Sequence, residues 1–201
     1  MFTPTVLIEY DRSAAERETE QATFGTGCFW GPDAAFGALD GVIRTRVGYA
    51  GGTKPDPTYS VLGDHTEVVQ VEFDPERLTY QDILGEIFSS HNPCNQAKKR
   101  QYQNVILAET EDQYEAILDF LAASAFSRDE IETRIETLSQ FHPAENYHQK
   151  YNLRGKRWLT ESFDEAGYDA EDIRESPAAA KLNAHVAGHD VSVPFLDART
   201  R

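Results

Sequence analysis

The alternation of apolar and polar residues predicts a regular series of strands and helices up to about residue 138. Short runs rich in β-branched and aromatic residues are typical of strands, and apolar residues recurring every three or four positions are typical of helices. These patterns predict strands over 21–25, 42–49, 67–73, 105–107 and 131–138, and helices over 29–39, 79–90 and 114–121. The predicted order is therefore β-α-β-β-α-β-α-β.

This order, with one direct step from strand to strand, predicts an α+β fold. We expect a two-layer mixed sheet with packed helices around a ferredoxin-like βαββαβ core. Two further helices are predicted over 156–167 and 169–188, packed over that core. The chain thus divides into an N-terminal extension (1–20), a main domain (21–151) and a C-terminal helical extension (152–201).

Composition and charge narrow the classes of function. The chain has 201 residues, 40% of them hydrophobic, which suffices for one globular domain with a core. The formal net charge of −15 argues against a nucleic-acid partner. No run approaches the roughly 18 apolar residues that a membrane span needs, and the N-terminus lacks the pattern of a signal peptide. We therefore expect a cytoplasmic protein that neither spans a membrane nor binds nucleic acid.

The two cysteines, Cys28 and Cys94, are too few for a disulfide framework and lack zinc-type spacing. Cys28 stands where a predicted strand gives way to a helix, and backbone N–H groups at a helix N-terminus favour a thiolate. The alternative use of such a cysteine is a small apolar residue in the core. His185 and His189 are four positions apart, but no third ligand lies near them in sequence, so we expect no metal site.

The segment Gly27-Cys28-Phe29-Trp30-Gly31 carries a resemblance that continues along the chain. The further motifs are Gly48-Tyr49-Ala50-Gly51-Gly52, Asp56-Pro57-Thr58-Tyr59, His65-Thr66-Glu67-Val68-Val69, Phe73-Asp74-Pro75, His91-Asn92-Pro93, Gln101-Tyr102 and Pro143-Ala144-Glu145-Asn146-Tyr147-His148-Gln149-Lys150-Tyr151. In this order they resemble the A-type peptide-methionine sulfoxide reductases over 21–151, which would make that range the catalytic domain.

The resemblance implies an enzyme that reduces the S epimer of methionine sulfoxide, free or in proteins, with thioredoxin or another thiol as reductant and no cofactor. It implies that Cys28 is the nucleophile and becomes a sulfenic acid, that Glu67 is the proton donor, and that Tyr59 hydrogen-bonds the sulfoxide oxygen. Phe29 and Trp30 would form the apolar wall for the S-methyl group. Taken alone, a strand-end Glu is usually exposed, and aromatic residues at a helix start usually pack in the core.

Three features depart from the family pattern. Asn92 stands where the family typically has an Asp that holds the active-site network and incoming water. Tyr59 and Glu67 are only eight positions apart, a shorter loop than usual, and the stretch 94–100 lacks the family's Gly-Asn-Asp turn. Tyr102 aligns with a different tyrosine of the family, so the second active-site tyrosine stays unassigned.

The family's usual C-terminal resolving cysteines are missing, because no cysteine follows Cys94. Cys94 lies two positions after Asn92 and is therefore the candidate resolving cysteine, with a small apolar filler as the alternative. The departures also leave open a degenerate module that binds oxidised methionine peptides or a partner without efficient turnover. A cysteine hydrolase is disfavoured, because no pairing of a nucleophile with a base can be recognised.

Overall fold

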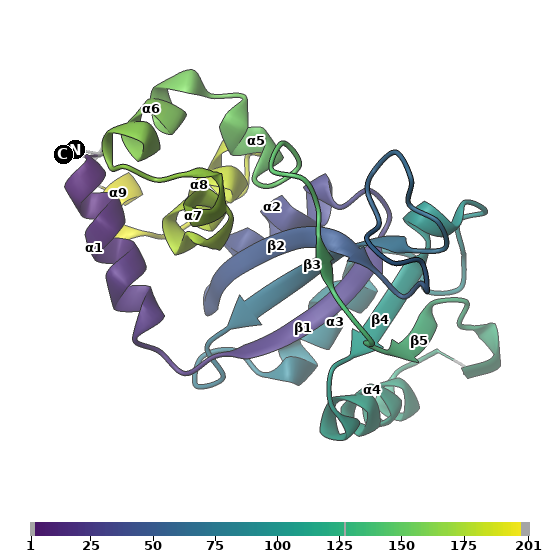
Figure 1. Ribbon diagram of the computed structural model, residues 1–201. Coiled ribbons are helices and arrows are strands. Elements are labelled where there is room, and N and C mark those ends of the chain that lie inside the picture. The colour runs from purple at the N-terminus through teal and green to yellow at the C-terminus, as the bar shows by residue number, and fades with distance from the viewer. Residues whose placement is uncertain (1–2, 127, 198–201) are drawn as a thin grey trace.

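A computed structural model describes residues 3–126 and 128–197, drawn as a ribbon in Figure 1. The strands are β1 (Glu20–Thr26), β2 (Val42–Ala50), β3 (Thr66–Phe73), β4 (Asn104–Ala108), β5 (Arg134–Thr137) and β6 (His142–Pro143). The helices of the first part are α1 (Pro4–Ala15), α2 (Trp30–Ala38), α3 (Tyr80–Ser90) and α4 (Glu111–Ala123), with 3₁₀ turns η1 (Arg100–Tyr102) and η2 (Arg128–Glu130). Those that follow are α5 (Tyr151–Arg154), α6 (Arg157–Glu165), α7 (Ala170–Glu175), α8 (Pro177–Val186) and α9 (Pro194–Asp197).

The strands form one mixed sheet in the order β5-β4-β1-β3-β2-β6. All neighbouring strands are antiparallel except β4 and β5, which are parallel. The inner order β4-β1-β3-β2, with α2 after β1 and α3 after β3, is the split βαβ arrangement of ferredoxin-like folds. The α+β prediction and the predicted order of elements are confirmed.

The main core lies between one face of the sheet and the helices α2 and α3, which stand behind the sheet in Figure 1. Alternate residues of each strand enter it, as the period of two requires. Phe24 of β1, Val71 of β3 and Ile83 of α3 are each essentially inaccessible to solvent. Burial of such a side chain stabilises a fold by about 1.5–3 kcal/mol, so this layer holds the sheet rigid beneath the site.

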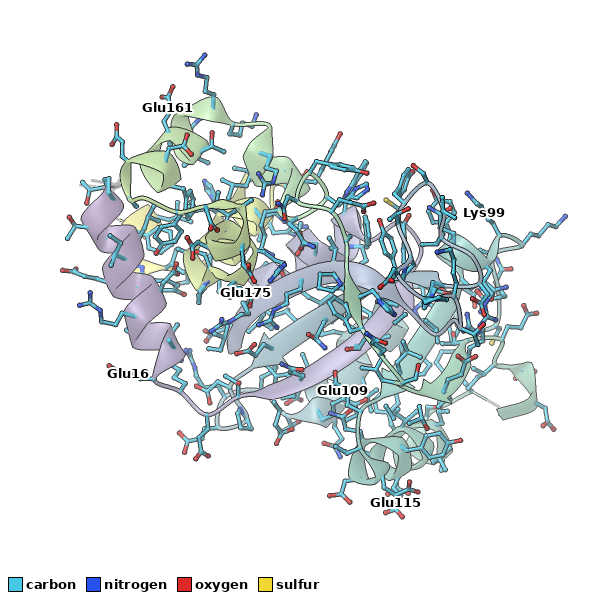
Figure 2. All side chains as sticks on the ribbon, viewed as in Figure 1. Glu16, Lys99, Glu109, Glu115, Glu161 and Glu175 are labelled. Atoms are coloured by element: carbon cyan, nitrogen blue, oxygen red, sulfur yellow. The ribbon has the colours of Figure 1, made fainter. Side chains whose placement is uncertain are left out.

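The opposite face of the sheet is covered by the chain that leaves β5, which crosses in front of the strands in Figure 1. Leu138 and Phe141 of this crossing chain pack on a small cluster that contains Val68 and Leu107. Farther along the same face, Glu175 of α7 lies over the sheet (Figure 2) and forms ion pairs with arginines of β2.

A second apolar cluster joins the two extensions of the chain. It contains Leu7 of α1, Phe163 of α6, Leu182 of α8 and Phe195 of α9, and Figure 1 shows these helices gathered on one side of the sheet. No helix was predicted within 1–20, although Thr3 caps α1 through its side chain and Pro4 stands at its start. The two extensions therefore pack together, whereas the division into domains itself stays a prediction.

Two predicted elements are shorter than expected. The helix predicted over 169–188 is divided into α7 and α8, because Pro177 lacks an N–H and Ser176 caps a new helix through its side chain. The strand predicted over 131–138 is limited to β5, where the parallel register with β4 runs from Arg134 to Thr137. None of the helices described is long and apolar enough to cross a lipid bilayer.

Candidate active site

Cys28 lies in the tight turn that connects β1 to α2. Gly27 precedes it with φ of 97°, a backbone conformation that glycine adopts readily and other residues rarely do. The turn leaves the Cys28 thiol exposed, while the next residue, Phe29, is buried at the start of α2. The backbone N–H of Trp30 hydrogen-bonds the thiol, which matches the expected contact between this cysteine and a helix N-terminus.

Glu67 is brought beside this turn by the pairing of β1 with β3. Its side chain is only 2% exposed. One carboxyl oxygen accepts the Phe29 N–H at 3.2 Å and the other accepts the Gln101 side-chain amide at 2.6 Å. Burial raises the pKa of Glu67, against the opposing effects of the two hydrogen bonds and the charge of Lys99. A carboxyl with a raised pKa retains its proton to higher pH and can act as an acid there.

Although the Cys28 residue is exposed, the pKa of its thiol is also raised, first by partial burial of the thiol and second by the nearby charge of Glu67. The Trp30 N–H acts in the opposite direction but does not outweigh these two causes. The helix N-terminus therefore acts on Cys28 in the expected direction, and burial together with the charge of Glu67 outweighs it. Because the negative charge of Glu67 contributes to the raised pKa of Cys28, protonation of Glu67 eases ionisation of Cys28.

Tyr59 and Tyr102 form a hydroxyl pair at the mouth of the site. Tyr59 lies in the loop between β2 and β3, and its backbone N–H donates to Glu145 at 2.9 Å. A hydrogen bond to Tyr59 raises the pKa of Tyr102 to about 12, with smaller contributions from burial and from the charges of Glu67, Tyr59 and Cys28. Sequence analysis did not place Tyr102 here. The only sequence signal was the Gln101-Tyr102 motif, which does not show what Tyr102 contacts.

The rings around the site meet at His148, which is 2% exposed. Its ring lies 5.2 Å from that of Phe29, 4.8 Å from that of Tyr59 and 4.2 Å from that of Tyr147. Neither nitrogen of the His148 ring has a hydrogen-bond partner among the described residues. The segment 147–151 therefore packs beside the active site.

The two residues predicted to form the methyl-binding wall differ in exposure. Phe29 is 1% exposed and belongs to the main core, where its ring lies 6.0 Å from that of Tyr49. Trp30 is half-buried and stacks face to face on Tyr151, with ring centroids 3.7 Å apart. The apolar surface beside Cys28 is therefore made of Trp30 together with Tyr151, with Phe29 beneath it.

Asn92 and Cys94 are not brought into this cluster by any hydrogen bond that the structure describes. Asn92 is exposed, and its side-chain oxygen accepts the Cys94 N–H at 3.0 Å. Between them, the Pro93 carbonyl accepts the N–H of Thr133, just ahead of β5. Thr133 directly precedes β5, which lies two strands from β1 in the sheet. Both thiols are free.

A buried ion pair ties the helix that follows Cys28 to the C-terminal helices. Asp33 of α2 and Lys150 are both fully buried, with 3.6 Å between the carboxyl oxygen and the ammonium nitrogen. Asp33 also accepts hydrogen bonds from the side chains of Thr45 and Asn183. Burial lowers the pKa of Lys150, while the charge of Asp33 acts against that shift. This network positions α2, and with it the turn of Cys28, against β2 and α8.

No group of three or more potential metal ligands occurs within the ranges 3–126 and 128–197. His185 is on α8 and exposed, and His189 follows that helix, also exposed. The chemistry that the site offers is that of a thiol, a buried carboxyl and two phenols.

Comparison with known proteins places this arrangement in a family. The family model described as peptide methionine sulfoxide reductase matches residues 20–175. A peptide methionine sulfoxide reductase of Drosophila melanogaster is 39% identical over 174 residues, covering 83% of this chain and 68% of that protein. The enzyme MsrA of Methanothermobacter thermautotrophicus is 42% identical over 150 residues, covering 69% of this chain and 89% of that one.

A solved structure similar to this chain belongs to the same family as its sequence relatives. Methionine sulfoxide reductase A of Corynebacterium diphtheriae superposes with a TM-score of 0.62 at 28% identity, over 70% of this chain and 77% of that one. The match of the family model covers the turn of Cys28, the strand of Glu67 and the aromatic segment around His148. The chain belongs to the peptide methionine sulfoxide reductase family.

Proposed function

We propose that this enzyme reduces the S epimer of methionine sulfoxide through direct attack by Cys28. The thiolate sulfur attacks the sulfoxide sulfur, the S–O bond breaks, and the oxygen passes to Cys28 as a sulfenic acid while the thioether of methionine leaves. The observation that carries the proposal is the buried carboxyl of Glu67, hydrogen-bonded to the N–H of Phe29 in the turn that presents Cys28. The thiol of Cys28 and the carboxyl bound to the next residue supply the nucleophile and the proton that the reaction needs.

Glu67 is the proposed proton donor to the sulfoxide oxygen. Its raised pKa supports this role, because a carboxylate that had already lost its proton would repel the oxygen as negative charge develops there. The coupling of Glu67 with Cys28 adds a second effect. Transfer of the Glu67 proton toward bound substrate requires that the carboxyl be protonated, and in that state the site also favours the Cys28 thiolate.

Tyr59 is the proposed hydrogen-bond donor to the sulfoxide oxygen, and Tyr102 supports it by donating its own hydroxyl proton to Tyr59. A tyrosine whose own hydroxyl receives a hydrogen bond is a better donor to a third group, because such chains polarise one another. The bond between Tyr102 and Tyr59 supports that arrangement. The apolar surface of Trp30 would accept the S-methyl group, which favours methyl sulfoxides over charged ones.

Two thiols then return the sulfenic acid of Cys28 to the free thiol. A first thiol attacks the sulfenic acid of Cys28, releasing water and leaving a disulfide, and a second thiol opens that disulfide and restores Cys28. We propose thioredoxin or another small dithiol as the source, and repair of oxidised proteins as the use. A cytoplasmic location is part of the proposal, since reducing compartments keep thiols such as Cys28 and Cys94 free.

Cys94 remains the proposed resolving thiol. A disulfide needs the two Cα atoms within about 7 Å, so the segment 92–95 would have to approach Cys28 after oxidation. Asn92 hydrogen-bonds this segment, and its effect on the rate is therefore proposed to be indirect.

The test is the loss of methyl sulfoxide from N-acetyl methionine sulfoxide with dithiothreitol as the reductant. The parent chain should turn over the S epimer and leave the R epimer. Cys28→Ser should abolish turnover with an unchanged circular dichroism spectrum, because a hydroxyl does not supply a thiolate near neutral pH. Activity of Cys28→Ser within a fewfold of the parent would contradict the mechanism. Binding of the sulfoxide without turnover by the parent would favour the binding module instead.

A further inference from the structure

An open pocket adjoins the aromatic surface of the active site and has no part in the chemistry described above. It encloses about 550 Å³ and is lined by Tyr147, Tyr151, Arg154 and Lys156 among other residues. Most of its lining residues come from α5 and the chain between α5 and α6. Its volume is that of a site for a side chain or a small molecule.

The pocket shares its aromatic wall with the site of Cys28. Tyr151 lines the pocket and stacks on Trp30, which is two positions after Cys28 in the chain. Tyr147 lines the pocket as well and packs on His148, whose ring contacts those of the active site. An extended peptide advances about 3.3–3.6 Å per residue, so a residue two or three positions from the oxidised methionine spans about 7–10 Å. Because the pocket and the site of Cys28 share the wall of Trp30 and Tyr151, a side chain at that reach from the methionine is the part of a bound peptide that would meet the pocket.

The charge of the pocket is opposite to that of the protein. The chain carries a net charge of −15, yet the described lining of the pocket includes two cations and no carboxylate. Lys156 forms no ion pair with the described residues, and the nearby carboxylate of Glu161, labelled on α6 in Figure 2, pairs with Arg157 at 2.9 Å. A local positive patch on an acidic protein attracts acidic groups by its field.

The guanidinium of Arg154 has an N–H donor without a hydrogen-bond partner among the described residues. Its Nε donates to the Gln149 carbonyl at 2.8 Å, whereas its Nη2 is buried with no hydrogen-bond partner among the described residues. Buried donors of this kind are uncommon in folded proteins and call for a partner. Burial lowers the pKa of Arg154, an effect that a bound anion would offset.

We propose that this pocket is a subsite for the carboxylate of an aspartate or glutamate two or three residues from the oxidised methionine in a peptide substrate. The planar guanidinium of Arg154 matches a carboxylate in shape, and Lys156 adds a second charge. The rings of Tyr147 and Tyr151 contact the peptide between the carboxylate and the methionine. The subsite rests on the proposed function, since it requires a peptide whose sulfoxide reaches Cys28.

The experiment compares blocked peptides that contain one methionine sulfoxide and either Asp or Asn at each of the positions −3, −2, +2 and +3. At one or more of these positions, Asp should raise kcat/KM over Asn by about fivefold to tenfold, the net size of one hydrogen bond in water. The gain should come from a lower KM at constant kcat. It should fall in 1 M salt, where the screening length is about 3 Å.

Two variants separate the subsite from general effects of charge. Arg154→Gln and Lys156→Gln should each reduce the preference for Asp and leave kcat/KM for N-acetyl methionine sulfoxide unchanged. The matched control, Arg12→Gln, removes an exposed cation from α1 and should retain the preference. Because Arg154 also binds Gln149, the Lys156 variant keeps the test valid if the other one folds poorly.

Equal kcat/KM for every Asp and Asn pair in the parent would overturn the subsite, as would a preference that persists in both variants. In either case reduction of N-acetyl methionine sulfoxide would continue, and the proposed function would stand. Absence of any sulfoxide reduction by the parent would refute the proposed function, and the subsite with it.

Discussion

Replacement of Lys150 by methionine tests the buried ion pair that positions the helix after Cys28. The substitution keeps the length of the side chain and removes its ammonium group. Asp33 then retains hydrogen bonds from Thr45 and Asn183, both neutral donors, but loses its buried cation. Removing one partner of a buried pair costs about 3–5 kcal/mol, because the remaining charge is uncompensated. That is a large share of the roughly 5–15 kcal/mol by which folded domains are stable.

Two further variants, Asp33→Asn and the double variant, show whether the loss of stability comes from breaking the ion pair of Asp33 with Lys150. Asp33→Asn alone leaves the Lys150 ammonium without its counter-charge and should also cost about 3–5 kcal/mol. The double variant Asp33→Asn, Lys150→Met carries no buried charge at this place. It should therefore be less destabilised than the sum of the two single variants by about 2 kcal/mol or more. The exposed residue Lys98 supplies a matched control, because Lys98→Met should change the stability by no more than about 0.5 kcal/mol.

Urea unfolding followed by far-ultraviolet circular dichroism measures the free energy of unfolding of each variant. Comparable slopes against urea among the variants would show that they unfold over the same surface area. A loss of less than about 1 kcal/mol in the free energy of unfolding of Lys150→Met would refute the reasoning, since an uncompensated buried charge destabilises a fold by more than that. Strict additivity in the double variant would likewise show that Asp33 and Lys150 act independently.

The remaining predictions concern the reactive groups. Glu67→Gln should lower kcat by about 10²–10⁴-fold with a smaller effect on KM, the range for loss of a general acid, and an unchanged kcat would show that Glu67 has another role. The same variant removes a charge that raises the pKa of Cys28, so alkylation of Cys28 by iodoacetamide should begin at lower pH than in the parent; a midpoint at the same or higher pH contradicts the coupling. Asn92→Asp should change kcat/KM by less than about twofold, because the side chain is exposed and bonds only the Cys94 N–H among the described contacts; a larger change across pH would place the residue in the reaction. One equivalent of methionine sulfoxide should consume both thiols if Cys94 resolves the sulfenic acid, and persistence of one titratable thiol would reject that role.

Patterns of neighbouring residues in the sequence predicted the position of Cys28 and the order of the strands and helices. The position of Cys28 between a strand and a helix follows from a change in hydrophobic period and from Gly27, which supplies the required backbone conformation. The order of strands and helices follows in the same way, because each period depends only on the backbone geometry of its own segment. The helix break at Pro177 was also visible in principle, since proline lacks the N–H that a continuous helix needs.

The partners across the sheet were decided by tertiary structure. Gln101 donates to Glu67 although 34 positions separate them, and that contact depends on the alignment of β3 with the chain before β4. The same alignment brings Tyr102 to Tyr59, which no spacing along the chain could indicate. The motif of Asn92 and Cys94 resembles a catalytic one, and tertiary structure adds that the Pro93 carbonyl between them accepts N–H groups just ahead of β5.

The pKa shifts and buried charges of the site were likewise not predictable from the sequence. A helix start next to Cys28 favours a thiolate, but the pKa of that thiol depends on how deeply it is buried and on the charge of Glu67. Lys150 reads as a surface residue in a polar segment, whereas the fold buries it completely against Asp33. Sequence therefore determined the reactive groups and the elements that carry them, and only the packing of those elements decided which charges meet, since burial and through-space interactions exist only in three dimensions.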